Sequence, residues 1–455
     1  MLLLTNASIF NFDTGELIDN AHILINKNLV EKIVEKQSNP ALFNDFQKGK
    51  YGGIKVNYTM DCTNKIVIPG LTNTHSHTAM TLLRGAAEDV NTVDWFNKHI
   101  WIYEKNLIPE YVYYGSLLGA AEMLLSGVTF VCDHYFYMDM AFKAYREAGI
   151  RADLAWAVFG QGENWEKDFK LAMDFTESYK NSDETITVSL GPHSPYICPE
   201  SFLKEIAKLS ETMKLKTHIH VSEEKWQVDK SLKETGKTPI KYLHDLGIVK
   251  HNSILAHAYH ATDEELKLIK KSGALVAHAP KTYMKFGSVM PLLPRALKEK
   301  IKISFASDGP TSNNTLSIIE AARDAALLAK TSLSNAEIAR IEELIPLLNA
   351  GYSLFNKKIG RVEEGFIADL VILNRNHPAM IPEINLKANL LYSLSERAIE
   401  TVIVNGKIVV QNGEILTVDL YNLRKTVNEI SNRMINPNVS PGKGASSKPM
   451  QEFGK

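Results

Sequence analysis

The feature that most constrains the fold is a repeated unit of apolar strand, loop and amphipathic helix, which fills the chain from Ile66 to about Asn356. Neighbouring parallel strands need a helical crossover, and eight such units in about 290 residues match a (β/α)8 TIM barrel. An open, doubly wound sheet is the structural alternative, but no Gly-x-Gly-x-x-Gly segment opens any unit. We therefore predict a distorted barrel with strands over 66–74, 129–133, 152–158, 186–190, 216–220, 253–256, 274–277 and 301–306. Helices are expected over 110–125, 200–213, 263–271, 292–299 and 315–330.

Short strands with turn signals flank the barrel at both ends of the chain. Asn405-Gly406 and Asn412-Gly413 separate β-branched runs, which is a strong signal for tight hairpins. We predict that the two ends pair into one composite β-sandwich domain, with strands over 2–9, 21–25, 30–34, 369–373, 398–404 and 407–410. The resulting division is 1–65 and 359–420 for the β-sandwich, 66–358 for the barrel, and 421–455 for a C-terminal helix and a tail, disordered from Asn436 onward. The polar residues 36–58 are expected to form a surface excursion.

Composition and charge exclude several classes of protein. The net charge is −1, so nothing global attracts the chain to nucleic acid or to a membrane surface. No apolar run approaches the roughly 18 residues of a spanning helix, and the N-terminus lacks the features of a signal peptide. The three cysteines are far apart and odd in number, which argues against disulfides and against a Cys-based zinc site. We expect a cytoplasmic protein that acts on a small molecule through His, Asp and Glu, and a homo-oligomer is left open.

Titratable side chains gather at the ends of the predicted barrel strands, where barrel enzymes carry their chemistry. Two histidines on one face of a strand can bind one small cation, and zinc favours imidazole ligands. A lone histidine at a strand end is more often a hydrogen-bonded loop residue, but five of eight strands end in such groups, which predicts a shared metal site. The groups are His75 and His77 after the first strand, His218, His220 and Glu223 after the fifth, His257 after the sixth, His278 after the seventh and Asp308 after the eighth.

The chemistry of these groups indicates different roles. Three imidazoles and a carboxylate around zinc leave room for one water, whose pKa the cation lowers to about 7. Glu223 lies beyond its strand and suits proton transfer to a substrate nitrogen. His257 can hydrogen-bond the activated water or polarise the reacting group, and Asp308 can both bind metal and accept a proton. We predict Glu223, His257 and Asp308 as the catalytic residues.

This set of residues resembles the amidohydrolase superfamily. A closer likeness is to its 5′-methylthioadenosine/S-adenosylhomocysteine deaminase branch, which also contains triazine-hydrolysing relatives. The motifs that carry this likeness are Thr74–Arg84, Gly191-Pro-His-Ser-Pro-Tyr196 and Ser307-Asp-Gly-x-x-Ser-Asn-Asn314, and the resemblance runs from about residue 2 to residue 416. It implies hydrolytic removal of ammonia from an aromatic ring. It also implies one divalent metal, Zn²⁺ or alternatively Fe²⁺, held by His75, His77, His220 and Asp308.

The resemblance further implies an adenine nucleoside substrate, such as 5′-methylthioadenosine, adenosine or S-adenosylhomocysteine, attacked by metal-bound hydroxide at the amino-bearing ring carbon. Glu104 matches the family glutamate that holds the ribose hydroxyls. Trp95, His193 and Ser312 match positions near the nucleoside, and Glu223 contacts the ring as well.

Two departures from the family pattern affect the expected substrate. Relatives that accept the homocysteine carboxylate supply arginines around strands 3 and 4, whereas this chain has none between Arg151 and Arg295. The segment His278–Gly287 places Tyr283 where the family usually has asparagine. We predict a nucleoside with a neutral 5′ group over S-adenosylhomocysteine, with Lys281 as an alternative point charge for the carboxylate.

Other functions remain open at this stage. A deaminase or chlorohydrolase of another N-heterocycle, such as an s-triazine, a pterin or guanine, would share the mechanism. A non-catalytic scaffold on the same fold is the rival from another class, but such proteins lose metal ligands. A binuclear site bridged by a carboxylated lysine is disfavoured, because the fourth strand has no lysine over 187–194.

Overall fold

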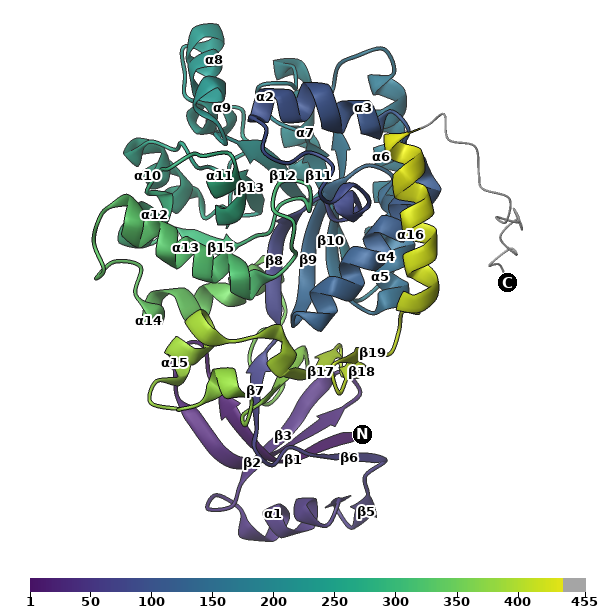
Figure 1. Ribbon diagram of the computed structural model, residues 1–455, viewed down its shortest axis with the longest axis vertical. Helices are drawn as coiled ribbons and strands as arrows, with labels where there is room; N and C mark the ends of the chain where they lie inside the picture. The colour runs from purple at the N-terminus through teal and green to yellow at the C-terminus, as the bar shows by residue number, and fades with distance from the viewer. Residues whose placement is uncertain (437–455) are drawn as a thin grey trace.

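The computed structural model describes residues 1–436 and contains a parallel barrel beside a sheet built from both chain ends (Figure 1). The eight barrel strands lie in sequence order, each hydrogen-bonded to the next. The first and last strands also meet, because the Thr74 hydroxyl donates to the Phe305 carbonyl at 3.0 Å and the Asp308 N–H donates to the His75 carbonyl at 3.0 Å. The predicted barrel is confirmed. Its strands are β8 (Leu71–Ser76), β9 (Val128–Tyr135), β10 (Arg151–Val158), β11 (Ile186–Pro192), β12 (Lys216–Val221), β13 (Ser253–His257), β14 (Leu275–His278) and β15 (Lys302–Phe305).

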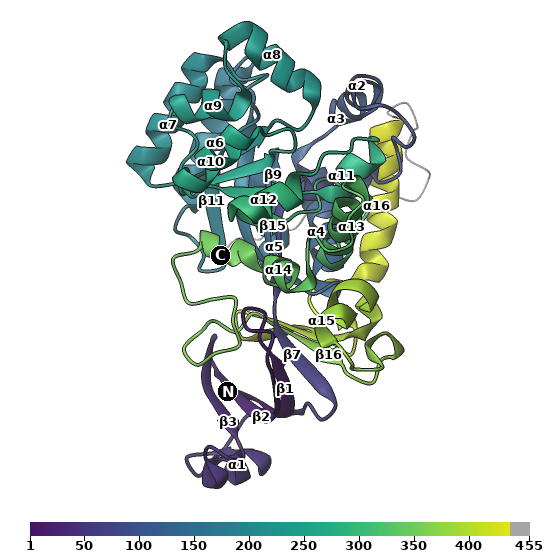
Figure 2. The same ribbon diagram turned by 90° about the vertical axis from the view of Figure 1, so that its left-hand side faces the viewer.

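Helices cover the outside of the barrel, so its strands are buried on both faces (Figures 1 and 2). Helix α10 (Asp263–Ser272) shows how the sequence determines where such a helix begins and ends. The Thr262 side chain accepts the Glu265 N–H while the Glu265 carboxylate accepts the Thr262 N–H, and Gly273 ends the helix with a φ of 75°. The other covering helices are α4 (Pro109–Leu125), α5 (Met138–Ala148), α6 (Trp165–Tyr179), α7 (Glu200–Met213), α8 (Lys225–Thr235), α9 (Pro239–Asp245), α11 (Pro280–Lys285), α12 (Leu292–Glu299) and α13 (Ile318–Ser332).

The two chain ends form one nine-stranded sheet, as the alternating strand patterns predict. Apolar side chains from both ends fill a single core, in which Leu4 and Ile23 pack with Leu370 and Ile403. The Val30 N–H donates to the Phe366 carbonyl at 2.9 Å, which ties the N-terminal strands to the C-terminal segment. The sheet contains β1 (Leu2–Phe10), β2 (Leu17–Asn26), β3 (Leu29–Glu35), β6 (Tyr58–Asp61), β7 (Lys65–Pro69), β16 (Leu370–Asn374), β17 (Ile399–Val404), β18 (Lys407–Gln411) and β19 (Glu414–Ile415).

The strand expected over 66–74 is two strands, so that prediction is wrong. Strand β7 pairs with β1 and β16 in the composite sheet, whereas β8 begins the barrel at Leu71. Pro69 has no N–H to donate, and a side chain at Gly70 would lie 1.9 Å from the Thr129 hydroxyl oxygen. The chain therefore leaves the sheet and enters the barrel at Pro69-Gly70.

Residues 36–58 are more ordered than a plain surface excursion, which corrects the prediction made from their polarity. They contain helix α1 (Pro40–Gln47) and the short strands β4 (Lys50–Tyr51) and β5 (Ile54–Lys55). Phe43 and Phe46 of α1 are buried against β1 and β2. The helix was not predicted because its buried residues are two phenylalanines in an otherwise polar segment.

Helix α16 (Leu420–Ile435) returns from the composite sheet to the barrel and runs along its side, next to α4 (Figures 1 and 2). Leu423, Val427 and Ile430 are buried, and the Asn106 side chain donates to the Met434 carbonyl at 2.8 Å. The tail expected to be disordered lies outside the described residues except for Asn436. No helix within residues 1–436 has the length and apolar character needed to cross a membrane.

Candidate active site

Three histidines and one aspartate predicted as metal ligands meet at the C-terminal end of the barrel. The Nε2 atoms of His77 and His220 are 3.2 Å apart. Asp308 Oδ1 lies 3.4 Å from the Nε2 atoms of both His75 and His77. Because β8, β12 and β15 are parallel, their carboxyl ends meet at one edge, which explains how positions 75, 220 and 308 come together.

The hydrogen bonds of two of these rings fix where their lone pairs point. Nδ1 of His77 lies 2.5 Å from the His134 carbonyl oxygen, and Nδ1 of His220 lies 2.8 Å from the His193 carbonyl oxygen. A carbonyl can only accept, so each Nδ1 carries the proton and each Nε2 presents a lone pair. The two lone pairs therefore face each other, an arrangement that a cation between them would stabilise.

The remaining ligand candidates agree with a divalent metal. Nε2 of His75 is buried and has no hydrogen-bond partner within residues 1–436. A tetrahedral ion with ligands 2.0–2.1 Å away spaces neighbouring ligand atoms about 3.3 Å apart, which matches the observed separations. A ring nitrogen of His257 also lies near His75 and Asp308, so geometry alone allows His257 as a ligand. The donor set fits a divalent metal.

Burial and neighbouring groups shift the pKa values of Glu223 and Asp308 in opposite directions. Burial, and next the charge of Asp308, raise the pKa of Glu223 well above its usual value. Burial also acts to raise the pKa of Asp308, but His75 and the other nearby imidazoles lower it below the usual range. Thr282 and Ser312 hydroxyls donate to Asp308 Oδ2 at 2.9 and 2.7 Å. The site therefore shifts Glu223 toward its protonated form and Asp308 toward its ionised form.

The side chain of His257 lies next to Glu223, and the distance from its Nε2 to Glu223 Oε1 is 3.7 Å. Burial lowers the pKa of His257 to about 3, so its imidazole is neutral. Both groups line the pocket above the metal ligands.

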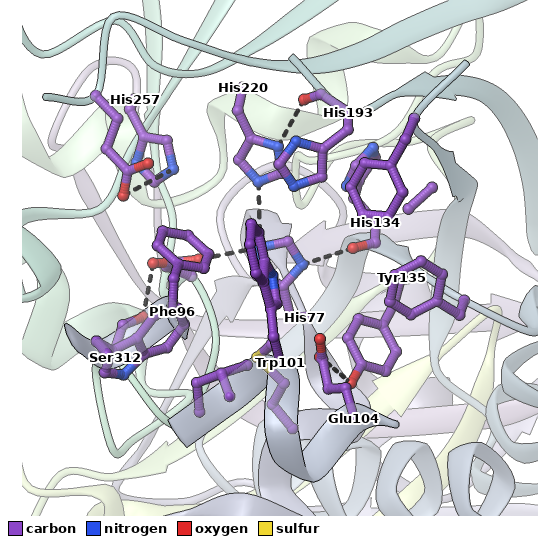
Figure 3. Close-up of a pocket in the computed structure, with 18 of the residues that line it drawn as sticks. His77, Phe96, Trp101, Glu104, His134, Tyr135, His193, His220, His257 and Ser312 are labelled. Carbon is purple, nitrogen blue, oxygen red and sulfur yellow. Dashed lines mark hydrogen bonds and ion pairs between the residues drawn. The ribbon is translucent and has the colours of Figure 1, made fainter. Parts of the chain in front are cut away.

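All the residues predicted to contact the substrate line one pocket over the metal ligands (Figure 3). The space between its walls, including the open mouth, is about 650 Å³. One wall comes from the π-helical turn η2 (Trp95–Ile100) and α3 (Trp101–Glu104), which follow the short helix α2 (Thr92–Asp94). Such π-turns are frequent at functional sites. The structure brings together Trp95, Glu104, His193, Glu223, His257, Asp308 and Ser312 around this space.

Glu104 is the acidic group at the outer end of the pocket. The Tyr135 hydroxyl donates to its Oε1 at 2.5 Å, while Oε2 makes no hydrogen bond within residues 1–436. Burial raises the pKa of Glu104 to about 7, and the Tyr135 hydrogen bond opposes part of that rise. The carboxylate can accept further hydrogen bonds from a polar ligand.

Sequence reasoning missed several residues of the site. His134 and Tyr135, at the end of β9, line the pocket, and a strand predicted to end at Asp133 stopped just short of them. His218 was named in the predicted cluster but given no role, and its Nε2 lies 2.8 Å from Nδ1 of His75, a metal-ligand candidate. His278, which ends β14, is buried but does not line the pocket. A histidine at the end of a strand is the signal that would have found His134. The same signal wrongly placed His278 in the predicted cluster.

Comparison with known proteins places the chain in a family. Residues 66–409 match the amidohydrolase family. The chain is 35% identical over 443 residues to the 5-methylthioadenosine/S-adenosylhomocysteine deaminase of Thermoanaerobacter pseudethanolicus, which covers 95% of this chain and 100% of the relative. It is 37% identical over 367 residues to the 5′-deoxyadenosine deaminase of Methanocaldococcus jannaschii, covering 79% of this chain and 87% of the relative.

Solved structures share the fold. An adenosine deaminase from Xanthomonas campestris with bound zinc superposes with a TM-score of 0.88 at 24% identity, over 95% of this chain and 98% of that one. The atrazine chlorohydrolase of Arthrobacter aurescens complexed with zinc gives a TM-score of 0.84 at 20% identity, over 95% and 100%.

The chain belongs to the amidohydrolase family, which confirms the resemblance read from its motifs. It is an enzyme built on a distorted barrel with a composite sheet, and its site is suited to a divalent metal.

Proposed function

We propose that the protein is a hydrolytic deaminase of an adenine nucleoside that carries a neutral 5′ group, working with a single Zn²⁺ ion. The observation that carries this proposal is the pair of lone pairs on His77 and His220, which face each other 3.2 Å apart below a pocket that also contains Glu223 and Glu104. The metal end of the pocket suits the reacting ring, and the Glu104 end suits a sugar. The names of the relatives, which are deaminases of methylthioadenosine, S-adenosylhomocysteine and 5′-deoxyadenosine, support the same assignment.

His75, His77, His220 and Asp308 would hold the metal. When bound there, a divalent zinc ion supplies a Lewis acid that lowers the pKa of water to about 7. One ion is favoured because the fourth barrel strand offers no lysine to bridge a second.

Glu223 is assigned proton transfer. Burial and the charge of Asp308 raise its pKa, which favours the protonated carboxyl that can give a proton to a ring nitrogen of the substrate. Asp308 is ionised and can accept a proton from the attacking water. His257, which is neutral, can donate a hydrogen bond to the oxygen that adds to the ring. Together these groups stabilise the addition intermediate before ammonia leaves.

Glu104 is assigned the ribose hydroxyls. A carboxylate accepts two hydroxyl hydrogen bonds more strongly than a neutral acceptor does. Trp95 and His193 border the same pocket and are assigned to the base. Burial lowers the pKa of His193 to about 3, so it adds no positive charge there.

The surroundings of the sugar favour a neutral 5′ group. No arginine of residues 1–436 lines the cavities around Glu104. Lys281 is not available as a point charge, because its ammonium pairs with Glu320 away from the pocket. Lys105 and Lys167 border the outer cavities, but both side chains are exposed to solvent. A buried homocysteine carboxylate would thus lack a bidentate partner.

The test is ammonia release from adenosine, 5′-methylthioadenosine, 5′-deoxyadenosine, S-adenosylhomocysteine, guanine, a pterin and an s-triazine, each assayed with wild type and Glu104→Ala. We expect the nucleosides with neutral 5′ groups to give the highest kcat/KM and to lose most of it in Glu104→Ala. A preference for S-adenosylhomocysteine greater than about tenfold, or 1.4 kcal/mol, would overturn the neutral-group assignment. Higher kcat/KM with a triazine or free base, unaffected by Glu104→Ala, would replace the nucleoside with another N-heterocycle.

A further inference from the structure

Tyr283, on helix α11, lies directly behind His257 and is almost completely buried at 2% exposure. Its hydroxyl oxygen is 3.2 Å from Nδ1 of His257. His257 itself has a φ of 73°, a left-handed conformation that is uncommon and strained for a residue other than glycine. Such a conformation persists only when the surrounding structure holds it, and strained residues of this kind cluster at active sites.

A second tyrosine fixes Tyr283 in place. The rings of Tyr259 and Tyr283 are stacked with centroids 3.6 Å apart and an interplanar angle of 14°. The Tyr259 hydroxyl accepts from the Met290 N–H at 2.7 Å and donates to the Ser288 carbonyl at 3.2 Å. Tyr259 is also only two residues after His257, so the stack joins the end of β13 to α11.

The same helix supports a second residue of the site. The Thr282 hydroxyl donates to Asp308 Oδ2 at 2.9 Å, while Tyr283, the next residue, contacts His257. Lys281 anchors the start of α11 by pairing with Glu320 on α13. Consecutive side chains of one anchored helix therefore reach two different groups at the barrel mouth.

We propose that Tyr283 is a positioning residue that donates its hydroxyl proton to Nδ1 of His257 and so keeps the histidine's own proton on Nε2. Nε2 faces Glu223 Oε1 at 3.7 Å, and an acceptor oxygen on that side favours a protonated nitrogen there. A protonated Nε2 has no lone pair, so this tautomer removes His257 from the metal ligands that distance alone allows. It makes His257 a hydrogen-bond donor to the reacting atoms.

The kinetic test compares Tyr283→Phe with Tyr242→Phe. Both substitutions keep the ring and remove a hydroxyl, but the Tyr242 hydroxyl faces Glu200 at 3.3 Å on the outside of the barrel. We expect Tyr283→Phe to lower kcat by about 10–100-fold, the usual effect of losing a partner behind a reacting group, with KM nearly unchanged. Tyr242→Phe should leave kcat near the wild-type value, and both proteins should retain the wild-type metal content.

A spectroscopic test does not depend on the substrate. Side-chain ¹⁵N spectra of histidine-labelled holoprotein, with His257 assigned through His257→Asn, should show Nε2 protonated in wild type and a mixture of tautomers in Tyr283→Phe. This proposal rests on the proposed function only through the measurement of kcat. If no nucleoside is a substrate, the proposed function is rejected, but the spectra still decide the role of Tyr283. An unprotonated Nε2 in wild type, loss of metal in Tyr283→Phe, or an unchanged kcat would each overturn the proposal.

Discussion

Each end of the barrel contains a buried aspartate, and the two aspartates differ in how many hydrogen-bond donors surround them. At the base, where the barrel meets the composite sheet, Asp369 accepts from Arg151 at 2.8 and 3.1 Å, from Tyr352 at 3.1 Å and from the Asn405 N–H at 2.7 Å. Each of its oxygens has two donors. At the mouth, Asp308 Oδ2 has two hydroxyl donors, whereas Oδ1 faces the Nε2 atoms of His75 and His77.

This difference separates a structural network from a functional one. A buried charge whose hydrogen bonds are complete holds two domains together and offers nothing to a ligand. A buried cluster whose lone pairs face one another is costly until something positive is bound. The comparison predicts that substitutions at the mouth change metal content and activity, whereas substitutions at the base change stability.

The largest effect is expected from His220→Ala, which removes one of the facing lone pairs. Elemental analysis should find about one metal per chain in wild type, as expected for a mononuclear site, and far less in the variant. Deaminase activity should fall to background, because no group replaces the ion's Lewis acidity. Two metals per wild-type chain would contradict the single-ion proposal, and full metal retention by the variant would contradict the ligand assignment.

Glu223→Gln tests proton transfer at the mouth without removing a ligand. The amide is nearly isosteric but cannot supply the proton, so kcat should fall by about 10²–10⁴-fold while the metal content is unchanged. Steady-state kinetics and elemental analysis on the same preparation separate the two effects. Near-normal turnover would show that Glu223 is an ordinary loop carboxyl.

At the base, Arg151→Met leaves the Asp369 charge buried without its main partner. The free energy of unfolding should fall by about 3–5 kcal/mol, measured by urea denaturation, with kcat of the folded protein preserved. Arg361→Met is the matched control, because its ion pair with Asp13 is about half exposed and such pairs contribute about 0–1 kcal/mol. Equal effects of the two substitutions would remove the distinction between the buried and exposed pairs.

The smallest effect concerns pH and Glu104. Its pKa is raised to about 7, so the carboxyl is protonated below that pH and becomes the stronger acceptor for ribose hydroxyls above it. The ratio of kcat/KM in wild type to that in Glu104→Gln should therefore rise between pH 6 and pH 8, by up to about tenfold for adenosine. The same ratio measured with 2′,3′-dideoxyadenosine should stay flat. A flat ratio for adenosine would show that the charge of Glu104 does not contribute to binding the sugar.

Much of the fold could be predicted because its signals are local. The strand–helix alternation gave seven barrel strands within a few residues, and Asn405-Gly406 marks the hairpin between β17 and β18. The interruption at Gly70 was missed, because the lack of space beside Thr129 arises from a strand about sixty residues later. The buried face of α1 was missed for a related reason, since its partners lie on β1 and β2.

The sequence by itself determined which groups stand at the mouth of the barrel. His75, His77, His220 and Asp308 each end a strand, and parallel strands must bring their ends to one edge. The tertiary structure alone decided how those groups are held. The carbonyls of His134 and His193 that fix two rings, the Tyr283 hydroxyl behind His257 and the ion pair that removes Lys281 from the pocket all join segments distant in the chain. Strand periodicity sets the direction of a side chain, but hydrogen-bond partners depend on loops and helices whose approach no local pattern specifies.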